Sequence, residues 1–306
     1  MRTLLVSTRG AFSLFLFSLN TVFWTFPLLF SHLLKLLLPV RGWRTFWSGV
    51  QNRIGTIWIS FNNLNLRVLN PVRWDVEGVE GLPPHEWYMV IANHRSWVDI
   101  LVLQRVFNRK IPFLKFFLKK ELFWVPFLGV AWWSLDFPFL ERSARADKDM
   151  ETIREAAEKF EILPVSIMNF VEGTRFTAEK QEKQRSPYRH LLKPKAGGLT
   201  FILSAMGERL HAILDVTIAY PGGTPTFWQF LCGEVREIRV RARAIPVEEE
   251  LLGDYSKDKA FRREFTDWLA GLWAAKDQAL AGLLGDTQGP VDPADPDSAA
   301  RGPETI

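Results

Sequence analysis

The chain of 306 residues contains one cysteine, no paired-cysteine or His-Glu-x-x-His metal motif and no glycine-rich nucleotide loop. Because Cys232 stands alone, an internal disulfide is excluded, and a reducing, cytosol-facing environment is the simplest expectation. We predict that Cys232 is a core residue. The missing motifs disfavour a metal centre and nucleotide chemistry, so we expect neither a metal nor a cofactor.

Acidic residues are absent from the first 74 residues, whereas residues 286–306 contain five acidic residues and one basic residue, Arg301. The net charge of +4 therefore hides a gradient from a basic start to an acidic end. A basic segment can bind nucleic acid, but this one contains a long apolar run, which fits an anionic membrane surface better. We expect membrane lipid, and no nucleic acid, as its partner.

The apolar run extends over residues 10–34 without a formally charged side chain. As a helix it would be about 37 Å long, enough to span a bilayer core. Two interpretations remain open, a transmembrane helix or one arm of a re-entrant hairpin kinked at Pro27. Residues 46–64 repeat apolar side chains every three or four positions, which predicts a second, amphipathic helix in the interface. If the run spans, the basic residues after it place the remainder in the cytoplasm, at a bacterial inner membrane.

Beyond residue 70, short apolar strands alternate with helices, which predicts an α/β fold. We predict strands at 87–92, 165–171, 212–220 and 235–245, and helices from 100 and at 147–162, 197–207 and 261–284. The chain therefore divides into a membrane anchor at 1–70, an α/β domain at 71–252, an amphipathic helix at 253–284 and a proline-containing acidic tail at 285–306 that we expect to be disordered.

His94 and Asp99 lie five positions apart where a predicted strand turns into a helix. The spacing alone would occur by chance in roughly one such chain in four. However, α/β sheets expose functional groups at the carboxyl ends of their strands. There an aspartate could orient the imidazole and stabilise its charged form, leaving the other ring nitrogen as a base. Alternatively, Asp99 caps the first turn of the helix and His94 is a polar loop residue.

Several blocks, taken together and in order, resemble the 1-acylglycerol-3-phosphate O-acyltransferase family of PlsC-like glycerolipid acyltransferases. Residues 93–99 resemble its catalytic His-x4-Asp block, residues 119–122 resemble the stretch leading to a second block that ends in Arg142, and residues 170–175 match its Glu-Gly-Thr-Arg block almost letter for letter. The resemblance covers about residues 73–220. It implies a glycerophosphate-acyltransferase-like α/β domain with an N-terminal membrane-associated helical segment.

The resemblance implies acyl transfer from a thioester, either acyl-CoA or acyl carrier protein, to the sn-2 hydroxyl of 1-acylglycerol-3-phosphate or a related lysophospholipid. His94 would be the general base and Asp99 its orienting partner. The resemblance also suggests phosphate-binding residues, namely Arg142, Glu172, Gly173 and Arg175, and oxyanion or donor contacts from Lys119, Lys120 or Lys195. Glu172 would contact the glycerol or brace Arg175. An acyl-enzyme on Ser96 is disfavoured because the chain has no G-x-S-x-G elbow.

Two departures from the family pattern concern the acceptor. Asp215 stands in a short apolar strand where the family usually has proline, and we expect this acid to affect acceptor choice. Residues 186–198 resemble a branch that includes lysocardiolipin-type enzymes, so the acceptor headgroup stays open. The function is thus phospholipid biosynthesis or remodelling. A membrane-bound lipid-binding scaffold without turnover is the competing hypothesis.

Overall fold

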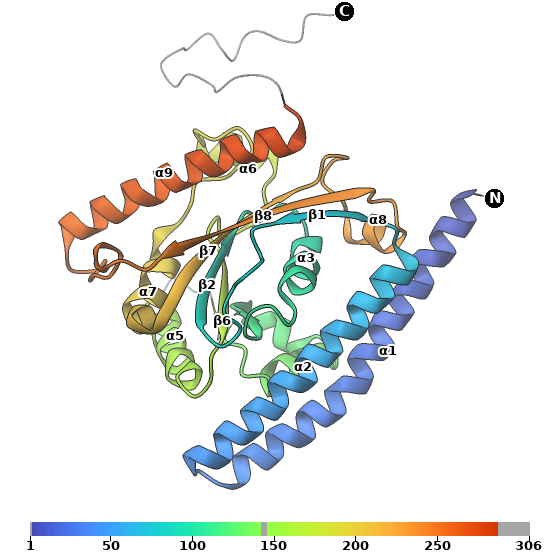
Figure 1. The fold of residues 1–306 in the computed structure, drawn as a ribbon, viewed down its shortest axis with the longest axis horizontal. Coiled ribbons are helices and arrows are strands. Elements are labelled where there is room, and N and C mark those ends of the chain that lie inside the picture. Colours follow the sequence, from blue (N-terminus) through green and yellow to red (C-terminus); the bar gives the residue numbers. More distant parts are fainter. Residues whose placement is uncertain (1, 142–145, 287–306) are drawn as a thin grey trace, which may run out of the picture.

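A mixed β-sheet with helices on both faces lies beside a long helical hairpin (Figure 1). The structure is a computed structural model, and it describes residues 2–141 and 146–286. The expected acidic tail, apart from its first two residues, and Arg142 lie outside the described residues. Within them, the predicted α/β fold class is confirmed.

The main sheet has six strands in the order β1-β8-β7-β2-β6-β3. Their bounds are β1 (Arg73–Glu77), β8 (Glu237–Pro246), β7 (Leu210–Ala219), β2 (Trp87–Ala92), β6 (Ser166–Phe170) and β3 (Leu114–Phe116). Only β7 and β8 pair antiparallel, and β4 (Leu118–Lys119) and β5 (Phe139–Leu140) form a separate parallel pair. Because β7, β2 and β6 are parallel, their carboxyl ends meet at one edge of the sheet.

The helices include every one that the sequence predicts. Their bounds are α1 (Arg2–Leu37), α2 (Arg41–Leu69), α3 (Val98–Phe107), α4 (Leu128–Ser134), α5 (Ala146–Phe160), α6 (Ala178–Gln184), α7 (Ala196–Met206), α8 (Phe227–Leu231) and α9 (Lys259–Leu284), with 3-10 turns at Lys120–Trp124, Gly207–Arg209 and Glu249–Leu251. The short helices α4, α6 and α8 were not predicted, because five to seven residues are too few to show a helical repeat.

The core lies on both faces of the sheet, as the apolar character of β2 requires. Tyr88, Val90 and Ala92 point to one face, where α3 and the hairpin pack, whereas Met89 and Ile91 point to the other, where α5, α7 and α9 pack. Successive side chains of a strand alternate between faces, so a strand covered on both sides is apolar throughout. The single cysteine, Cys232, is buried, as predicted.

The helical hairpin contacts the α/β domain at both ends of α1. Near its start, Arg9 donates a hydrogen bond to the carbonyl of Cys232, beside α8, and a Cβ at Gly10 would lie only 2.4 Å from Cys232 Sγ. Near its end, His32 Nδ1 lies 3.1 Å from the carbonyl of Ser134 and Lys35 forms an ion pair with Asp136. Helix α1 continues through Pro27, and the turn of the hairpin lies at residues 38–40.

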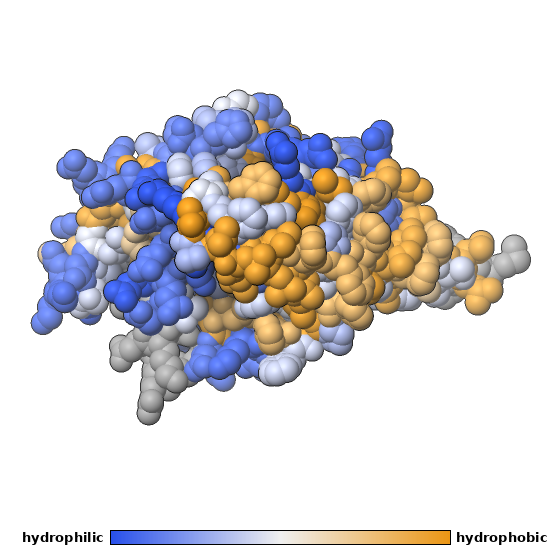
Figure 2. Space-filling view, turned by 90° about the horizontal axis from the view of Figure 1, so that it is seen from below, coloured by the Kyte–Doolittle hydropathy of each residue, from blue (hydrophilic) through white to orange (hydrophobic). Residues whose placement is uncertain are grey.

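One outer face of the hairpin is apolar. Figure 2 shows apolar side chains gathered over this side of the molecule. They include Phe12, Phe15, Leu19, Phe23, Phe26, Phe30, Phe61 and Leu64, all of them exposed. Within the described residues, the stretch 4–37 of α1 is long and apolar enough to cross a membrane.

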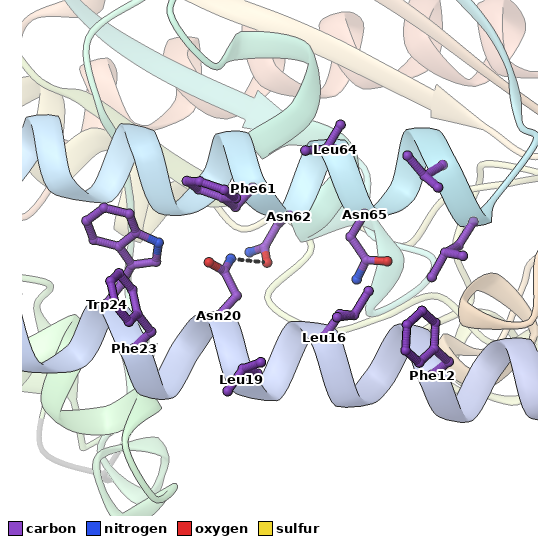
Figure 3. A pocket seen from close by; sticks show the side chains of 12 residues that line it. Phe12, Leu16, Leu19, Asn20, Phe23, Trp24, Phe61, Asn62, Leu64 and Asn65 are labelled. Carbon is purple, nitrogen blue, oxygen red and sulfur yellow. Dashed lines mark hydrogen bonds between the residues drawn. The ribbon is translucent and has the colours of Figure 1, made fainter.

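Polar side chains join the two arms of the hairpin. Asn20 donates to Asn62 at 2.8 Å, and Asn65 donates to the carbonyl of Ser13 at 3.1 Å. These groups lie in a groove of about 640 Å³ between α1 and α2, whose walls are otherwise apolar (Figure 3). Hydrogen bonds between asparagines fix the register of the arms where apolar packing alone would allow sliding.

Candidate active site

The corner that carries His94 is held to the sheet by the residue before it. Asn93 is fully buried, and its side-chain amide donates to the carbonyl of Ile218 at 2.9 Å and accepts from the Ile218 N–H at 2.8 Å. The amide thus imitates a strand residue and continues the pairing of β2 with β7 for one further step. The sequence analysis missed this role, although an asparagine that ends a buried strand is a usable signal.

His94 and Asp99 are in direct contact, as their spacing and setting predict. His94 Nδ1 lies 2.8 Å from Asp99 Oδ2, and the imidazole stacks on Phe170 with ring centroids 3.8 Å apart. An ionised carboxylate at that distance requires the proton on Nδ1, which leaves Nε2 as an acceptor. His94 also lines a cavity, so a substrate hydroxyl can reach the ring.

Asp99 organises the loop as well as the histidine. Its Oδ2 accepts the backbone N–H groups of Arg95 at 2.7 Å and Ser96 at 2.8 Å, and its Oδ1 accepts the hydroxyl of Tyr220 at 2.5 Å. These N–H groups precede α3, whose first turn contains Asp99 and has no side-chain cap hydrogen bond, so Asp99 holds the loop and does not cap the helix. The carboxylate is fully buried, and both of its oxygens have hydrogen-bond partners.

Ser96 is committed to the backbone. Its hydroxyl donates to the carbonyl of Pro225 at 2.6 Å and accepts the N–H of Val98 at 3.1 Å. The side chain is buried, and its proton points away from the histidine. This arrangement agrees with the expectation that Ser96 is not a nucleophile.

Glu172 lies under the catalytic loop, just after β6. Its Oε1 accepts the His94 N–H at 3.1 Å and its Oε2 accepts the Leu192 N–H at 3.0 Å. Burial raises the pKa of Glu172 to about 7, although both hydrogen bonds lower it. Because both oxygens accept backbone N–H groups, Glu172 fixes the loop that carries His94. Neither of these two hydrogen bonds is the contact with the phosphate, the glycerol or Arg175 that the sequence led us to expect.

The cavity beside His94 has a volume of about 660 Å³ and two kinds of wall. Its polar lining comes from His94, Lys119, Asn169, Thr174 and Arg175. Its apolar lining includes Phe116, Leu118, Leu122, Leu140, Met168 and Ile202. A cavity that is apolar in one part and cationic in another suits an amphiphile with an acyl chain and an anionic group.

The predicted cations differ in how they face this cavity. The Arg175 guanidinium lies 5.0 Å from the Trp97 ring centroid, and Arg175, Trp97 and Lys119 all line the cavity. Gly173 has φ +70°, a conformation that favours glycine, and the Lys195 side chain lies directly beside it. The structure therefore brings Arg175 and Lys119 together at the cavity and places Lys195 beside Gly173.

Lys120 lies apart from these groups. Its side chain is 61% exposed and pairs with Glu141 at 2.5 Å, and it is not part of the cavity lining. Such a position favours a surface ion pair over a contact with the reacting group.

Asp215, the expected acceptor determinant, points away from the cavity. Leu214 and Val216 of β7 face α3, so Asp215 faces α9, where the buried Lys276 pairs with it at 2.5 Å. Lys276 also donates to the carbonyl of Val216 at 2.7 Å. Burial lowers the pKa of Lys276 and the Asp215 carboxylate raises it. The acid that stands where the family usually has proline thus pairs with α9, and it is not part of the cavity lining.

Comparison with known proteins identifies this α/β domain. The family model described as Acyltransferase matches residues 73–221. Residues 73–221 are a domain of the acyltransferase family. The match agrees with the resemblance that the sequence blocks indicate over about residues 73–220, and it contains His94, Asp99 and Arg175.

Relatives of this chain act on several lysophospholipids, according to their names. Lysophosphatidylinositol acyltransferase 10 of Caenorhabditis elegans is 28% identical over 82% of this chain and 66% of its own length. Lysocardiolipin acyltransferase 1 of Danio rerio is 30% identical over 79% and 65%. The 1-acyl-sn-glycerol-3-phosphate acyltransferase 3 of Arabidopsis thaliana is 32% identical over 57% and 50%. The chain spans about half to two thirds of the length of these relatives.

A solved structure shares the fold of this chain. The 1-acyl-sn-glycerophosphate acyltransferase PlsC from Thermotoga maritima superposes with a TM-score of 0.52 at 19% identity. The match covers 90% of this chain and 98% of PlsC, so it includes most of the N-terminal helices as well as the sheet.

Proposed function

We propose that this chain transfers an acyl group from an acyl thioester to the sn-2 hydroxyl of 1-acylglycerol-3-phosphate or a related lysophospholipid. The observation that carries the proposal is the hydrogen-bonded pair of His94 and Asp99 at a cavity with both cationic and apolar walls. The names of the relatives support the same acceptor class.

The reaction needs one proton acceptor. Nε2 of His94 takes the proton of the acceptor hydroxyl while the hydroxyl oxygen bonds to the thioester carbonyl carbon. The buried Asp99 carboxylate, 2.8 Å from Nδ1, stabilises the imidazolium that forms. Collapse of the tetrahedral intermediate breaks the carbon–sulfur bond, and the thiolate leaves with the proton from His94. Acyl-CoA and acyl carrier protein present the same thioester to this pair.

The cations would hold the acceptor. We assign its phosphate to Arg175, whose guanidinium is kept in place by Trp97, with Lys195 beside Gly173 as a second cation. Lys119 remains the candidate for the oxyanion or the donor. The apolar part of the cavity lining, which includes Phe116 and Ile202, then binds an acyl chain.

We also propose that the hairpin lies within one leaflet. Both ends of α1 contact the α/β domain, so a spanning α1 would pull that domain into the hydrocarbon. The apolar face continues beyond the hairpin, because Phe26 contacts Phe127 with ring centroids 6.5 Å apart. Trp124 nearby is 79% exposed. This placement lets lipid enter from the side, with the domain on the cytoplasmic face of the membrane, the inner membrane in a bacterium.

The test is transfer of a labelled acyl group by the purified full chain to a panel of lysophospholipids, with both donors. We expect His94→Ala to lose about 10²-fold to 10⁴-fold in turnover while it still folds and binds membranes. Asp99→Asn should also be strongly impaired, because an amide cannot stabilise the imidazolium. Turnover that survives in His94→Ala refutes the base assignment. A wild-type chain inactive with every pair would favour the scaffold hypothesis.

A further inference from the structure

Tyr220 contacts the catalytic pair from a different part of the sequence. It follows β7 directly, its side chain is buried, and its hydroxyl donates to Asp99 Oδ1 at 2.5 Å. The other carboxylate oxygen faces His94 Nδ1. Asp99 is therefore shared between two side chains, the histidine that it stabilises and the tyrosine that competes for its charge.

This sharing has a physical consequence for His94. Each hydrogen bond donated to a carboxylate draws electron density from it, so less negative charge remains to stabilise the imidazolium on the other oxygen. The effect is large in a buried site because water does not screen it, and Asp99 has no exposed surface. A base that is less easily protonated stays active at lower pH.

We propose that Tyr220 is a positioning residue that holds Asp99 in register and limits the negative charge that the Asp99 carboxylate presents to His94. This inference rests on the proposed function of His94. It goes beyond the pair itself, because it makes the phenol at the end of β7 the third member of a hydrogen-bonded series from Tyr220 through Asp99 to His94.

The phenol keeps its proton at every working pH. Burial, and then the Asp99 charge, raise the pKa of Tyr220 well above its ordinary value, so it donates throughout. Among the described residues, Arg95 in the same loop is a charged neighbour of Tyr220 and Asp99, and Glu172 after β6 and Asp277 of α9 are in turn neighbours of Arg95. Of these, Glu172 titrates in the same range as a histidine and has to be separated from it.

The first experiment compares pH profiles of kcat/KM for wild type and Tyr220→Phe. The variant removes only the donor, so more Asp99 charge is available to the imidazolium and the pKa of His94 rises. We expect the acidic limb of the profile to move to higher pH by about one unit, equivalent to about tenfold less activity on that limb. The acceptor KM stays unchanged, because the phenol does not line the cavity.

Tyr88→Phe is the matched control. Tyr88 is also fully buried, on the neighbouring strand β2, and its hydroxyl donates to the carbonyl of Pro83 at 2.9 Å, away from the catalytic pair. A generic loss of one buried tyrosine hydrogen bond therefore occurs in both variants, whereas only Tyr220→Phe should move the acidic limb. Equal profiles for the two variants and wild type would reduce Tyr220 to a packing residue and overturn the proposal.

A second variant keeps the hydrogen bond and strengthens it. Site-specific replacement of Tyr220 by 3-fluorotyrosine preserves the hydroxyl but makes it the stronger acid and donor, so the acidic limb should move to lower pH. Opposite shifts from phenylalanine and fluorotyrosine cannot arise from misfolding. Repeating the phenylalanine comparison in a Glu172→Gln background removes the competing titration, and a shift that vanishes there assigns the limb to Glu172 and refutes the proposal.

A direct measurement separates this inference from the proposed activity. Isotope-labelled histidine in the full chain in detergent reports the pKa of each of the five histidines by NMR, and His94→Ala assigns the relevant signal. A raised His94 pKa in Tyr220→Phe supports the inference without any turnover. If wild type turns over but this pKa does not move, only the inference fails, whereas an inactive wild type with the shift present removes the proposed function.

Discussion

Removing one partner of the buried ion pair between Lys276 of α9 and Asp215 of β7 should destabilise the fold. The Lys276 side chain has 0% exposure and its Nζ lies 2.5 Å from Asp215 Oδ1. Lys276→Met would leave the Asp215 carboxylate buried with Arg243 as its remaining cation, at 3.4 Å and largely exposed. Loss of one partner of a buried pair costs about 3 to 5 kcal/mol. Since Arg243 stays, we expect the lower end, about 3 kcal/mol.

The double variant Asp215→Leu with Lys276→Met tests the cause of that loss. It removes both charges and puts apolar side chains in their place, so it should lie within about 1 kcal/mol of wild type, the remaining cost being the hydrogen bond to the Val216 carbonyl. The control is Arg243→Met, which breaks only the exposed contact and should cost less than about 1 kcal/mol.

Thermal unfolding of the full chain in detergent measures these differences. At about 2 to 4 °C per kcal/mol for a domain of this size, Lys276→Met should lower Tm by roughly 6 to 12 °C. The double variant should regain most of this difference. If Lys276→Met changes Tm no more than Arg243→Met does, or if the double variant is as unstable as the single one, the unpaired buried carboxylate is not the cause of the loss.

Three further predictions concern the phosphate, the pH dependence and the membrane. Arg175→Ala should raise the barrier of kcat/KM for the acceptor by about 2 to 4 kcal/mol and Arg175→Lys by less, because lysine lacks the planar fork; unchanged acceptor kinetics would exclude Arg175. The pKa of Glu172 is raised to about 7 in the folded state, so ionisation of this carboxyl group destabilises the fold. Relative to Glu172→Gln, the free energy of unfolding of wild type should therefore fall as pH rises from about 4.5 to about 7, and a parallel dependence in both would contradict this. Cysteines at the exposed Thr8 and Val40, with Cys232→Ala, should react with an impermeant maleimide from the same side of the membrane, whereas a spanning α1 would put them on opposite sides.

The sequence predicted the parts of the site that depend on nearby residues. His94 and Asp99 are separated by one turn, so the strand-to-helix corner alone brings them together. The contiguous block from Glu172 to Arg175 could be recognised in the sequence. The hydrogen-bond partners of Glu172 could not be predicted, because His94 and Leu192 come from two other segments.

The contacts that escaped prediction depend on the order and register of strands. Tyr220 reaches Asp99 across 121 positions only because β7 lies beside β2, and the face of Asp215 follows from the pairing of the same strands. A period-two pattern does not give register, and a strand buried on both faces has no polar side to reveal it. The short strands β3, β4 and β5, of two or three residues, carry too little pattern to be found.

With the hairpin within one leaflet, as proposed above, the apolar face that runs from α1 to Phe127 and Trp124 would place the proposed reaction at the bilayer surface. For an acceptor that enters laterally from the membrane, the relevant quantity is its surface concentration. The rate would therefore depend on its mole fraction among the lipids and not on its bulk concentration in the buffer. Diluting the acceptor with inert phospholipid at constant bulk concentration should then slow turnover. The product would stay in the same leaflet, and its escape would depend on two-dimensional diffusion.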